Sequence, residues 1–449
     1  MDGKVSLMRL LGDIEASSKM YAFVRNVLLV WVGVFGSLAL SFITQVIMAR
    51  SLTPNDYGVF FSALTLTLLL ATVCGYGLND YLIKIYGENK KEAERNLGYL
   101  LKASMLTVVV FASLLVSWAV WGPHDDNITR LYLCLTPMLI SQQLVNIISA
   151  KFQASGKFAV YSLLQSLQSI VRLLGAIGLI LIVGASTTGF SAVYLIASLV
   201  VVLILFPVWI GMSKEISADK QGSSVCGVWL TLKKTSPYGM AILFHLIYFQ
   251  SSVVLINYLS GSYEAGLYGV AFNIIAAICV LPSVIYQKVL IPRLHAIMAG
   301  ENWFALEIYK AGNGVMLLIG AIVFVMLVLL SPLFVIAVFG EEYSEAVLLV
   351  QLLGLSIPLR FLSSSFGALL YTRDYMSSKV KSMALVAFVN VSIGVALIPS
   401  YGGVGAICSV LISEILLAVL YGYIVKRNVY KTGFFEGWFD FKKLFVNEG

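Results

Sequence analysis

Two arginines stand inside long apolar stretches of the sequence, where an ionised side chain is costly and needs a reason. Arg172 lies 13 residues into the run 159–183, and Arg360 lies near the middle of the run 346–371, two residues after Pro358. If these runs cross a bilayer, a charge at mid-depth costs about 2.5–3.5 kcal/mol on insertion scales and marks a functional pathway by default. The two positions are therefore candidate walls of a polar cavity.

A polar stripe accompanies the first arginine along one helix face. At the spacing i, i+4, i+7, i+11, this face carries Tyr161, Gln165, Gln168 and Arg172. Hydrogen-bonding side chains that share one face of a membrane helix suit the wall of a hydrophilic cavity. The same position would be explained by structure alone if Arg172 capped carbonyl groups or paired with an acid such as Glu414.

Weaker polar sets occur in two other runs. The run 346–371 carries Ser356, Arg360 and Ser364 on one face, and the run 129–150 carries Gln142, Asn146 and Ser149. Pro358 frees backbone carbonyls and kinks the helix that holds Arg360. A structural ion pair remains an alternative for Arg360, and interhelical amide hydrogen bonds explain the set in 129–150 equally well.

Three further titratable residues inside apolar runs are candidates for proton exchange, namely Asp80, His245 and Glu414. Each of them has a structural alternative. The five cysteines and three histidines form neither a CxxC pair nor a zinc spacing. No metal or cofactor is therefore expected, and a coupling ion, H⁺ or Na⁺, is left open.

The composition identifies the chain that must position these residues as a membrane protein. Hydrophobic residues make up 59% of the 449 residues and charged residues 12%, about half the usual share for a soluble globular protein. A soluble chain of this size could not cover its surface with so few charges, so lipid must solvate part of it. The net charge of +7 does not indicate nucleic-acid binding, because the basic residues fall in short clusters between apolar runs.

Twelve apolar runs approach the length of about 20 residues that a bilayer core requires of one helix. They lie at 27–49, 58–82, 99–121, 129–150, 159–183, 189–212, 238–259, 266–291, 312–331, 346–371, 382–399 and 404–425. The stretch 332–346 is a candidate broken end of the ninth helix. The expected fold is an all-α polytopic membrane protein with about twelve transmembrane helices.

The distribution of basic residues tests that count. All but four of the 30 Lys and Arg residues fall at the termini or in loops that share their side of the membrane. Arg50 and Arg130 fall on the opposite side, and Arg172 and Arg360 lie inside runs. Cytoplasmic loops carry an excess of Lys and Arg, so both termini are expected in the cytoplasm. One span missing or added would destroy this asymmetry.

Three short matches at a nearly constant offset suggest an internal repeat. Tyr57-Gly58-Val59 matches Tyr268-Gly269-Val270, Gly87-Glu88-Asn89 recurs as Gly300-Glu301-Asn302, and Gly189-Phe-Ser-Ala192 resembles Gly403-Val-Gly-Ala406. With six spans per half, they predict two pseudo-repeated six-helix lobes around a central cavity, which is a transporter architecture. The predicted parts are a cytoplasmic segment 1–26, a lobe 27–212, a cytoplasmic linker 213–237, a lobe 238–425 and a cytoplasmic tail 426–449.

The loops are too short to form a soluble catalytic domain. The longest, 213–237, has about 25 residues, whereas small domains need about 40 or more. The sequence contains no GxxxxGK[ST], HExxH or GxSxG motif. A transporter is therefore expected, not an enzyme, and a membrane-embedded sugar polymerase or ligase would need a sizeable outer loop that is missing here.

The junction of the first two runs carries a family resemblance. The segment Arg50-Ser-Leu-Thr-Pro-Asn-Asp-Tyr-Gly58 resembles the AR-x-L-x-P-x-x-YG signature of the polysaccharide (O-antigen-type) flippase family. That family belongs to the superfamily of multidrug, oligosaccharidyl-lipid and polysaccharide exporters. The Gly75-Tyr-Gly-Leu78 turn, the basic loop after it and an arginine late in the fifth run are also similar to the family.

The resemblance implies a flippase of a bacterial inner membrane. Such a protein moves an undecaprenyl-pyrophosphate-linked oligosaccharide, such as an O-antigen repeat unit of lipopolysaccharide, from the inner to the outer leaflet by alternating access. In a cationic cavity of this kind, Arg172 and Arg360 would bind pyrophosphate or acidic sugars. The sugar hydroxyls would meet the polar side chains of Gln142, Asn146, Tyr161, Gln165, Gln168 and Ser364.

The resemblance also implies partners and an alternative. Membrane lipids, a polysaccharide polymerase and a chain-length regulator would be partners of a chain that acts as a monomer. The alternative is a cation-coupled multidrug exporter of the same superfamily. Such exporters typically use buried carboxylates, whereas Arg172 and Arg360 would repel a cationic drug.

Overall fold

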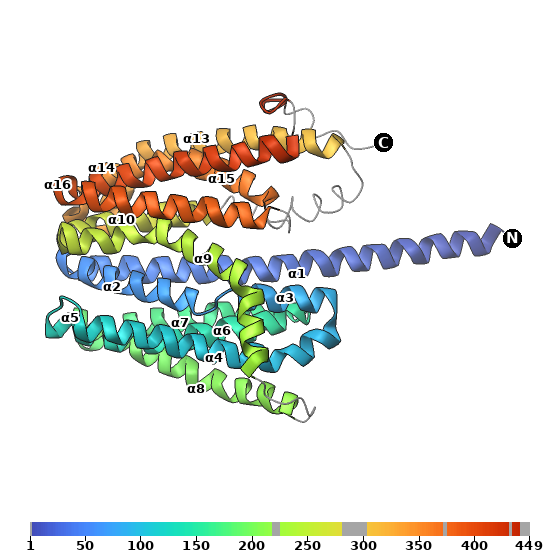
Figure 1. Cartoon of the computed structure of the whole chain (residues 1–449), viewed down its shortest axis with the longest axis horizontal. Coiled ribbons are helices and arrows are strands. Elements are labelled where there is room, and N and C mark those ends of the chain that lie inside the picture. Colours follow the sequence, from blue (N-terminus) through green and yellow to red (C-terminus); the bar gives the residue numbers. More distant parts are fainter. Residues whose placement is uncertain (1, 218–224, 281–302, 371–374, 431–432, 441–449) are drawn as a thin grey trace.

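The computed structural model describes residues 2–217, 225–280, 303–370, 375–430 and 433–440, and within these ranges the regular elements are helices without strands (Figure 1). The helices are α1 (Asp2–Ser51), α2 (Pro54–Val73), α3 (Leu78–Glu88), α4 (Lys90–Trp121), α5 (Asp126–Leu135), α6 (Pro137–Ala154), α7 (Phe158–Ile182), α8 (Thr187–Ser217), α9 (Val225–Leu259), α10 (Ser262–Ile278), α13 (Trp303–Phe339), α14 (Ala346–Gly354), α15 (Ser356–Leu369) and α16 (Met376–Val425).

The predicted all-α membrane fold is confirmed. In the described part of the chain, 10 helical stretches are long and apolar enough to cross a membrane. One of them, Met376–Asn428, joins two predicted spans across Gly402, whose φ of 54° and ψ of −132° are not helical. The predicted eighth span, 266–291, begins in α10, and its remainder lies outside the described residues. The ten stretches are therefore consistent with about twelve crossings.

Three predicted spans consist of two helices each. Between α2 and α3 the chain turns through Tyr76 and Gly77. Their φ angles of 40° and 70° lie in the left-handed region, so a right-handed helix cannot continue there. The break between α5 and α6 precedes Pro137, and α14 ends at Gly354. Gly354 is the residue whose carbonyl Pro358 cannot bond, because proline has no N–H. The kink predicted at Pro358 thus appears one turn earlier.

The predicted broken end of the ninth helix at 332–346 begins at Gly340, where φ is 108°, and not at Pro332. Helix α13 continues through Pro332 and ends at Phe339. Pro332 leaves the carbonyl of Val328, four residues earlier, without its helical donor. Gln351 Nε2 donates to that oxygen over 3.2 Å, and Ser331 Oγ donates over 3.3 Å. The helix continues because side chains replace the lost hydrogen bond.

Two lobes flank a central group of helices (Figure 1). Helices α3 to α8 lie on one side, α13 to α16 lie on the other, and α1, α2, α9 and α10 run between them. Helix α9 contacts α3 and α4 as well as α2, α10 and α16. The described parts of the predicted linker 213–237 are helical, because α8 extends to Ser217 and α9 starts at Val225. The lobe boundaries themselves stay a prediction.

Helices α2 and α10 cross with their backbones in contact. A Cβ atom added at Gly58 would collide with the carbonyl oxygen of Ser262, and one added at Gly266 would collide with that of Pro54. The two contacts are reciprocal, because Ser262 and Gly266 of α10 stand at the same offset, 208 residues, from Pro54 and Gly58 of α2. Reciprocal contacts of this kind are the mark of a two-fold axis. The structure therefore also relates α2 to α10, as the repeat predicts. The equivalent residues are shifted by about one helical turn from the predicted match of Tyr57 with Tyr268.

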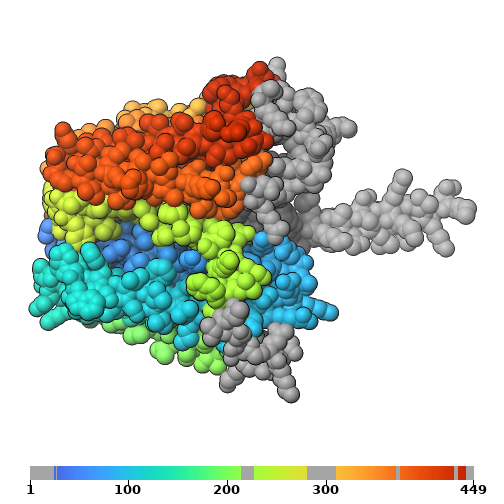
Figure 2. Space-filling view, viewed as in Figure 1, coloured from blue at the N-terminus to red at the C-terminus, as the bar shows by residue number. Residues whose placement is uncertain are grey.

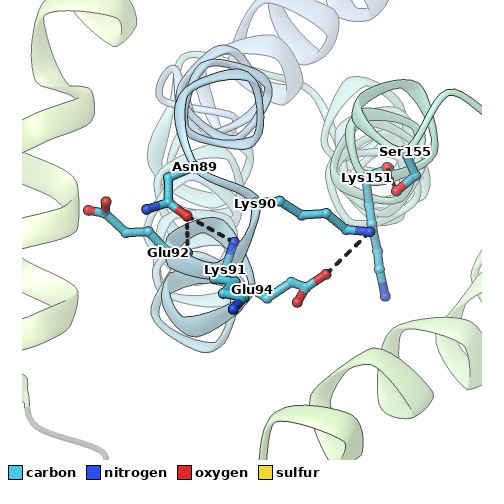
Figure 3. Close-up of polar contacts among 7 residues, drawn as sticks. All are labelled: Asn89, Lys90, Lys91, Glu92, Glu94, Lys151 and Ser155. Carbon is cyan, nitrogen blue, oxygen red and sulfur yellow. Dashed lines mark hydrogen bonds and ion pairs between the residues drawn. The ribbon is translucent and has the colours of Figure 1, made fainter.

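The turn between α3 and α4 lies at one end of the bundle (Figure 1). Asn89 Oδ1 accepts hydrogen bonds from the backbone N–H groups of Lys91 and Glu92 at 3.1 and 3.3 Å, and so caps α4. Lys90 is exposed at the same turn, with Nζ 4.0 Å from Glu94 Oε1, and the same close-up shows Lys151, near the end of α6 (Figure 3). Ammonium groups gathered at one end of a helical bundle are typical of the cytoplasmic end of a membrane protein.

Candidate functional site

Arg172 lies inside the N-terminal lobe with little compensation for its charge. Its side chain extends from α7, and its Cζ atom lies 4.9 Å from the centre of the Tyr194 ring on α8. The residue is 9% exposed, and its Nε and Nη2 atoms are buried without a hydrogen-bond partner among the described residues. An aromatic face offsets only part of the cost of removing a cation from water. The guanidinium therefore has unused donors for an anion.

Small residues position α7 against α1. Ser37 Oγ and Ser41 Oγ lie 2.9 and 3.0 Å from Ser169 Oγ, and Ser166 Oγ donates to the carbonyl of Gly33 over 3.2 Å. Without a hydrophobic driving force in lipid, such small residues and hydroxyl groups are what hold membrane helices together. They turn one face of α7 to α1 and leave the face with Arg172 to α8.

The predicted polar stripe on α7 divides between two roles. Gln168 is buried, and its Nε2 donates to Ser141 Oγ of α6 over 2.9 Å, which is a hydrogen bond between helices. Tyr161 and Gln165 are half-buried. Gln168 thus holds α6 against α7, whereas the side chains of Gln165 and Tyr161 remain partly exposed.

The amides of α6 divide in the same way. Gln142 Nε2 donates to Asn146 Oδ1 within the helix over 3.3 Å, and both residues are half-buried. The buried amide that joins α6 to α4 belongs to Gln143, whose Nε2 donates to Ser104 Oγ over 3.0 Å. The i, i+4 spacing could not reveal this contact, because Gln143 lies outside the pattern.

Arg360 lies in the C-terminal lobe and forms an ion pair. Its Nε atom is 2.8 Å from Glu414 Oε1 of α16, and the two side chains are 9% and 1% exposed. The acid that was an alternative partner for Arg172 therefore pairs with Arg360. The Arg360 Cζ atom also lies 4.4 Å from the centre of the Phe249 ring, and Nη1 is 4.0 Å from Cys279 Sγ.

His245 contacts the same aromatic ring as Arg360, that of Phe249. Its ring stacks on Phe249 with 5.7 Å between centroids and packs on Tyr248 at 5.2 Å. Phe249 thus separates His245 from Arg360, yet His245 itself is exposed. Sequence reasoning selected His245, Arg360 and Glu414 separately, and the structure brings them into one group, called the arginine–glutamate cluster below.

The remaining predicted residues lie apart from both arginines or make no polar contact with them. Ser364 is half-buried on α15. Asp80 is exposed in the first turn of α3, where the helix dipole favours a carboxylate. Across the described residues, no three His, Cys, Asp or Glu side chains come together as metal ligands would.

Lys379 is a buried cation that sequence reasoning assigned to a loop. It lies on α16, is 4% exposed and donates from Nζ to the carbonyl of Gly367 over 3.1 Å. Its neighbours in sequence, Ser378 and Lys381, are polar, so a hydropathy window excludes all three from a span. Only the packing of α16 against α15 reveals the burial.

A hydrogen-bonded chain at the centre was also missed. Asn273 Nδ2 of α10 donates to Tyr57 Oη over 2.9 Å, and Tyr57 Oη lies 3.3 Å from Gln45 Oε1 of α1. The three residues link helices from both halves of the sequence. The tyrosine of the Tyr57-Gly58 motif was the signal that could have found them.

The two halves also meet at the end of the bundle where α1 finishes, called the Arg50 end below. Arg50 Nη2 donates to the carbonyl of Ala337 over 2.6 Å, and Tyr343 Oη donates to that of Ala49 over 3.0 Å. These contacts join α1 to α13 and to the turn before α14. They would have to break if the lobes separated at this end.

An aromatic group closes the neighbouring part of the Arg50 end. Tyr132 Oη of α5 lies 3.0 Å from Tyr258 Oη of α9. The ring of His124, in the loop between α4 and α5, packs on Trp118, Tyr132 and Tyr258 with centroids 5.3, 5.3 and 5.7 Å away. Burial against these rings lowers the pKa of His124 below its ordinary value.

Known proteins share both sequence pattern and fold with this chain. Residues 23–298 match the model of a family described as polysaccharide biosynthesis protein. Among curated protein sequences none matches the chain.

Solved structures of a flippase and of transporters have the same fold. A lipid II flippase MurJ in an inward closed conformation is 16% identical with a TM-score of 0.67, over 89% of this chain and 87% of that one. An inward-facing multidrug resistance MATE family transporter of the MOP superfamily is 14% identical with a TM-score of 0.65, over 88% and 96%. A MOP superfamily transporter from Pyrococcus furiosus, described by a reverse polarity of its binding pocket, is 13% identical with a TM-score of 0.58, over 92% and 97%.

Proposed function

Because the chain belongs to the polysaccharide biosynthesis protein family, we propose that it is a flippase for a lipid-linked oligosaccharide. It moves an undecaprenyl-pyrophosphate-linked repeat unit of an O-antigen or another surface polysaccharide from the inner to the outer leaflet. The lobes alternate between access from one side and access from the other. The fold is that of a MOP-superfamily transporter of the flippase type, and the nature of the cargo is the proposal.

The observation that carries the proposal is the buried, unpaired guanidinium of Arg172. Two of its nitrogen atoms have no hydrogen-bond partner in the described structure, and its contact with Tyr194 is a ring face. A pyrophosphate offers several oxygen acceptors and a negative charge, which such a group binds through charge-assisted, often bidentate hydrogen bonds. A cationic cargo would gain nothing from this position.

The sugar and the lipid of the cargo need different surroundings. The half-buried Gln142, Asn146, Gln165 and Tyr161 supply donors and acceptors for sugar hydroxyls. The polyprenyl chain stays in the bilayer, because its apolar surface gains nothing by entering a polar cavity.

Arg360 has a different part in the proposed cycle, because Glu414 already neutralises it. An anion reaches this guanidinium only when the carboxylate releases it, and protonation of Glu414 would do so. Anion binding at Arg360 and proton uptake at Glu414 are therefore coupled in the proposal, with His245 at the accessible edge of the cluster.

The proposed location is a bacterial inner membrane with both termini in the cytoplasm. In this orientation the end of the bundle with the turn between α3 and α4 faces the cytoplasm, and Arg50 and Arg130 face the other side. The chain acts as a monomer. A polysaccharide polymerase and a chain-length regulator would use the oligosaccharide that reaches the outer leaflet.

A second candidate function is cation-coupled export of drugs, and one observation favours it. The carboxylate of Glu414 is 1% exposed, as a proton-binding site inside a membrane would be. Against it, the paired arginine cancels the charge that a cationic drug would need. Loss of drug efflux in Glu414→Gln, with unchanged binding of pyrophosphate lipid, would favour this function over the flippase.

Binding of undecaprenyl pyrophosphate to the purified full chain in nanodiscs tests the role of Arg172. Arg172→Ala should weaken binding about tenfold to a hundredfold, since a hydrogen bond to a charged group contributes about 1.5–3 kcal/mol. Arg172→Lys should retain part of the affinity, and the exposed Arg130→Ala should retain all of it. Undecaprenol, which lacks the pyrophosphate, should not distinguish the variants. Equal affinities of the wild type and Arg172→Ala for the pyrophosphate would contradict the assignment.

A further inference from the structure

A cavity of about 500 Å³ lies between α4 and the first turns of α9, away from both arginines. Its lining includes Leu106 and Val110 of α4, Trp229, Lys233 and Pro237 of α9, and Tyr76 of the turn before α3. The start of α9 lies on the molecular surface beside α3 and α4 (Figure 2). The cavity therefore opens on the outside of the bundle.

Exposed apolar residues of α4 continue the wall of this cavity into a strip about as long as one leaflet is deep. On α4, Leu106 and Val110 are 48% and 47% exposed, and Leu114, one turn further, is 54% exposed. With a rise of 1.5 Å per residue, the strip from Lys102 to Leu114 is about 18 Å long, and half of a bilayer core is about 15 Å. A strip of that length fits one acyl chain.

Two lysine side chains lie near one end of the apolar strip. Lys233 lines the cavity, and the exposed Lys102 precedes Leu106 by one turn. The described lining residues include no carboxylate. Trp229, which is 70% exposed beside Lys233, is of a type enriched at the level of lipid headgroups. The charge, the aromatic residue and the apolar strip together match the shape of an anionic phospholipid.

The cavity floor is formed by two irregular parts of the chain. Tyr76 has the left-handed φ of 40°, and its Oη lies 3.5 Å from Ser236 Oγ. A Cβ atom on Gly77 would lie 2.6 Å from Tyr238 Cβ, so the turn between α2 and α3 packs tightly against α9 just after Pro237. Helix α9, the first helix of the other half, is bent (Figure 1) and contains Pro237, which removes a helical hydrogen bond. A molecule in the cavity would contact this part of α9 and α4 of the N-terminal lobe.

We propose that this cavity is a binding site for an anionic phospholipid of the leaflet at the basic end of the bundle. One acyl chain lies along Leu106 and Val110, and the phosphate contacts Lys233. The lipid joins α4 to α9 and holds the bend at Pro237 in place. The site does not depend on which cargo the transporter carries.

Quenching of tryptophan fluorescence by brominated lipids tests the site in the full chain. Nanodiscs contain a fixed fraction of brominated phosphatidylglycerol or brominated phosphatidylcholine, and the contribution of Trp229 is obtained by comparison with Trp229→Phe. Phosphatidylglycerol should quench Trp229 at a lower fraction than phosphatidylcholine. Lys233→Gln should reduce that preference about fivefold, because one lysine near a membrane surface contributes about 1 kcal/mol to the attraction of an anionic lipid.

Matched variants separate the site from general surface charge and shape. Lys234→Gln removes the same charge from the neighbouring residue, which does not line the cavity, and should keep the preference. Val110→Phe fills the cavity and should weaken quenching by both lipids, whereas Val109→Phe, on an exposed position outside it, should not. Equal quenching by the two lipids, or equal effects of Lys233→Gln and Lys234→Gln, would overturn the proposal.

Discussion

At the scale of single residues, Arg360 and Glu414 are a buried ion pair whose members depend on each other. Breaking such a pair by removing one partner costs about 3–5 kcal/mol, because a charge is left buried and uncompensated. Glu414→Leu and Arg360→Met should each lower the temperature of thermal unfolding of the purified protein. The double variant should unfold at a higher temperature than either single variant. A double variant as unstable as the sum of both would show that the pairing is not what stabilises them.

Because of His124, we expect the stability of the folded protein to decrease as the pH falls. Burial against the aromatic rings lowers its pKa, so the folded chain favours the neutral ring more than the unfolded chain does. This contribution to stability is complete above the unfolded value of about 6.5 and is lost as the pH falls below it. Thermal unfolding measured between pH 7 and pH 5 should therefore show a larger decrease for the wild type than for His124→Phe. An equal decrease in both proteins would mean that other groups cause it.

The sequence predicted the types of important residues better than their partners. Charge inside an apolar run was enough to select Arg172, Arg360, His245 and Glu414. It could not show that Glu414 pairs with Arg360 and leaves Arg172 without an ionic partner among the described residues, because pairing depends on how α15 packs on α16. Lys379 escaped notice for the related reason that polar neighbours in sequence conceal a buried position.

At the scale of elements, the crossing of α2 and α10 at Gly58 is a direct test of the packing. Gly58→Ala should lower the thermal stability of the protein by about 1–3 kcal/mol or more, since the new Cβ atom meets a backbone carbonyl that cannot rotate away. Gly266→Ala should have a similar effect, because the contact is reciprocal. Gly211→Ala on α8 is the control, where a Cβ atom has open space. It should be neutral or slightly stabilising, and a Gly58→Ala protein as stable as this control would refute the crossing.

The positions of the membrane spans were readable from the sequence, whereas the break inside a span was predicted only near Pro358. An average over about 20 residues detects a span whether it is one helix or two, so the turn at Tyr76 and Gly77 disappeared inside the predicted span 58–82. Pro332 led to the opposite error, because a break was predicted there and the helix continues. Its effect depends on Gln351, 19 residues away in the sequence, which donates to the carbonyl that the proline leaves free.

At the scale of the whole molecule, charge asymmetry and repetition carried the prediction of the architecture. The bilayer restricts a long apolar chain to helices, because each backbone polar group must be satisfied within its own segment. Two lobes with central helices between them are the result (Figure 1). The sequence did not predict which residues of the two halves are equivalent. The structure relates α2 to α10 through the contact of Gly58 with Ser262, and not through the more similar residues around Tyr268.

The Arg50 end provides the means to test movement of the lobes. Arg50 and Ala337 are both exposed, and the side chain of one reaches the backbone of the other. Cysteines at these two positions can be joined by a short cross-linker with a disulfide in its spacer. The cross-link holds α1 against α13 until it is reduced, so one protein sample serves as its own control.

In the proposed cycle, the lobes must separate at the Arg50 end to release a lipid-linked oligosaccharide. The decisive measurement is the transfer of undecaprenyl-pyrophosphate-linked oligosaccharide between the leaflets of proteoliposomes, detected by an enzyme added outside. The Arg50→Cys, Ala337→Cys protein should transfer the lipid before cross-linking, stop after it and recover on reduction. Undiminished transfer by the cross-linked protein, or no transfer by the untreated protein above that of empty liposomes, would contradict the account.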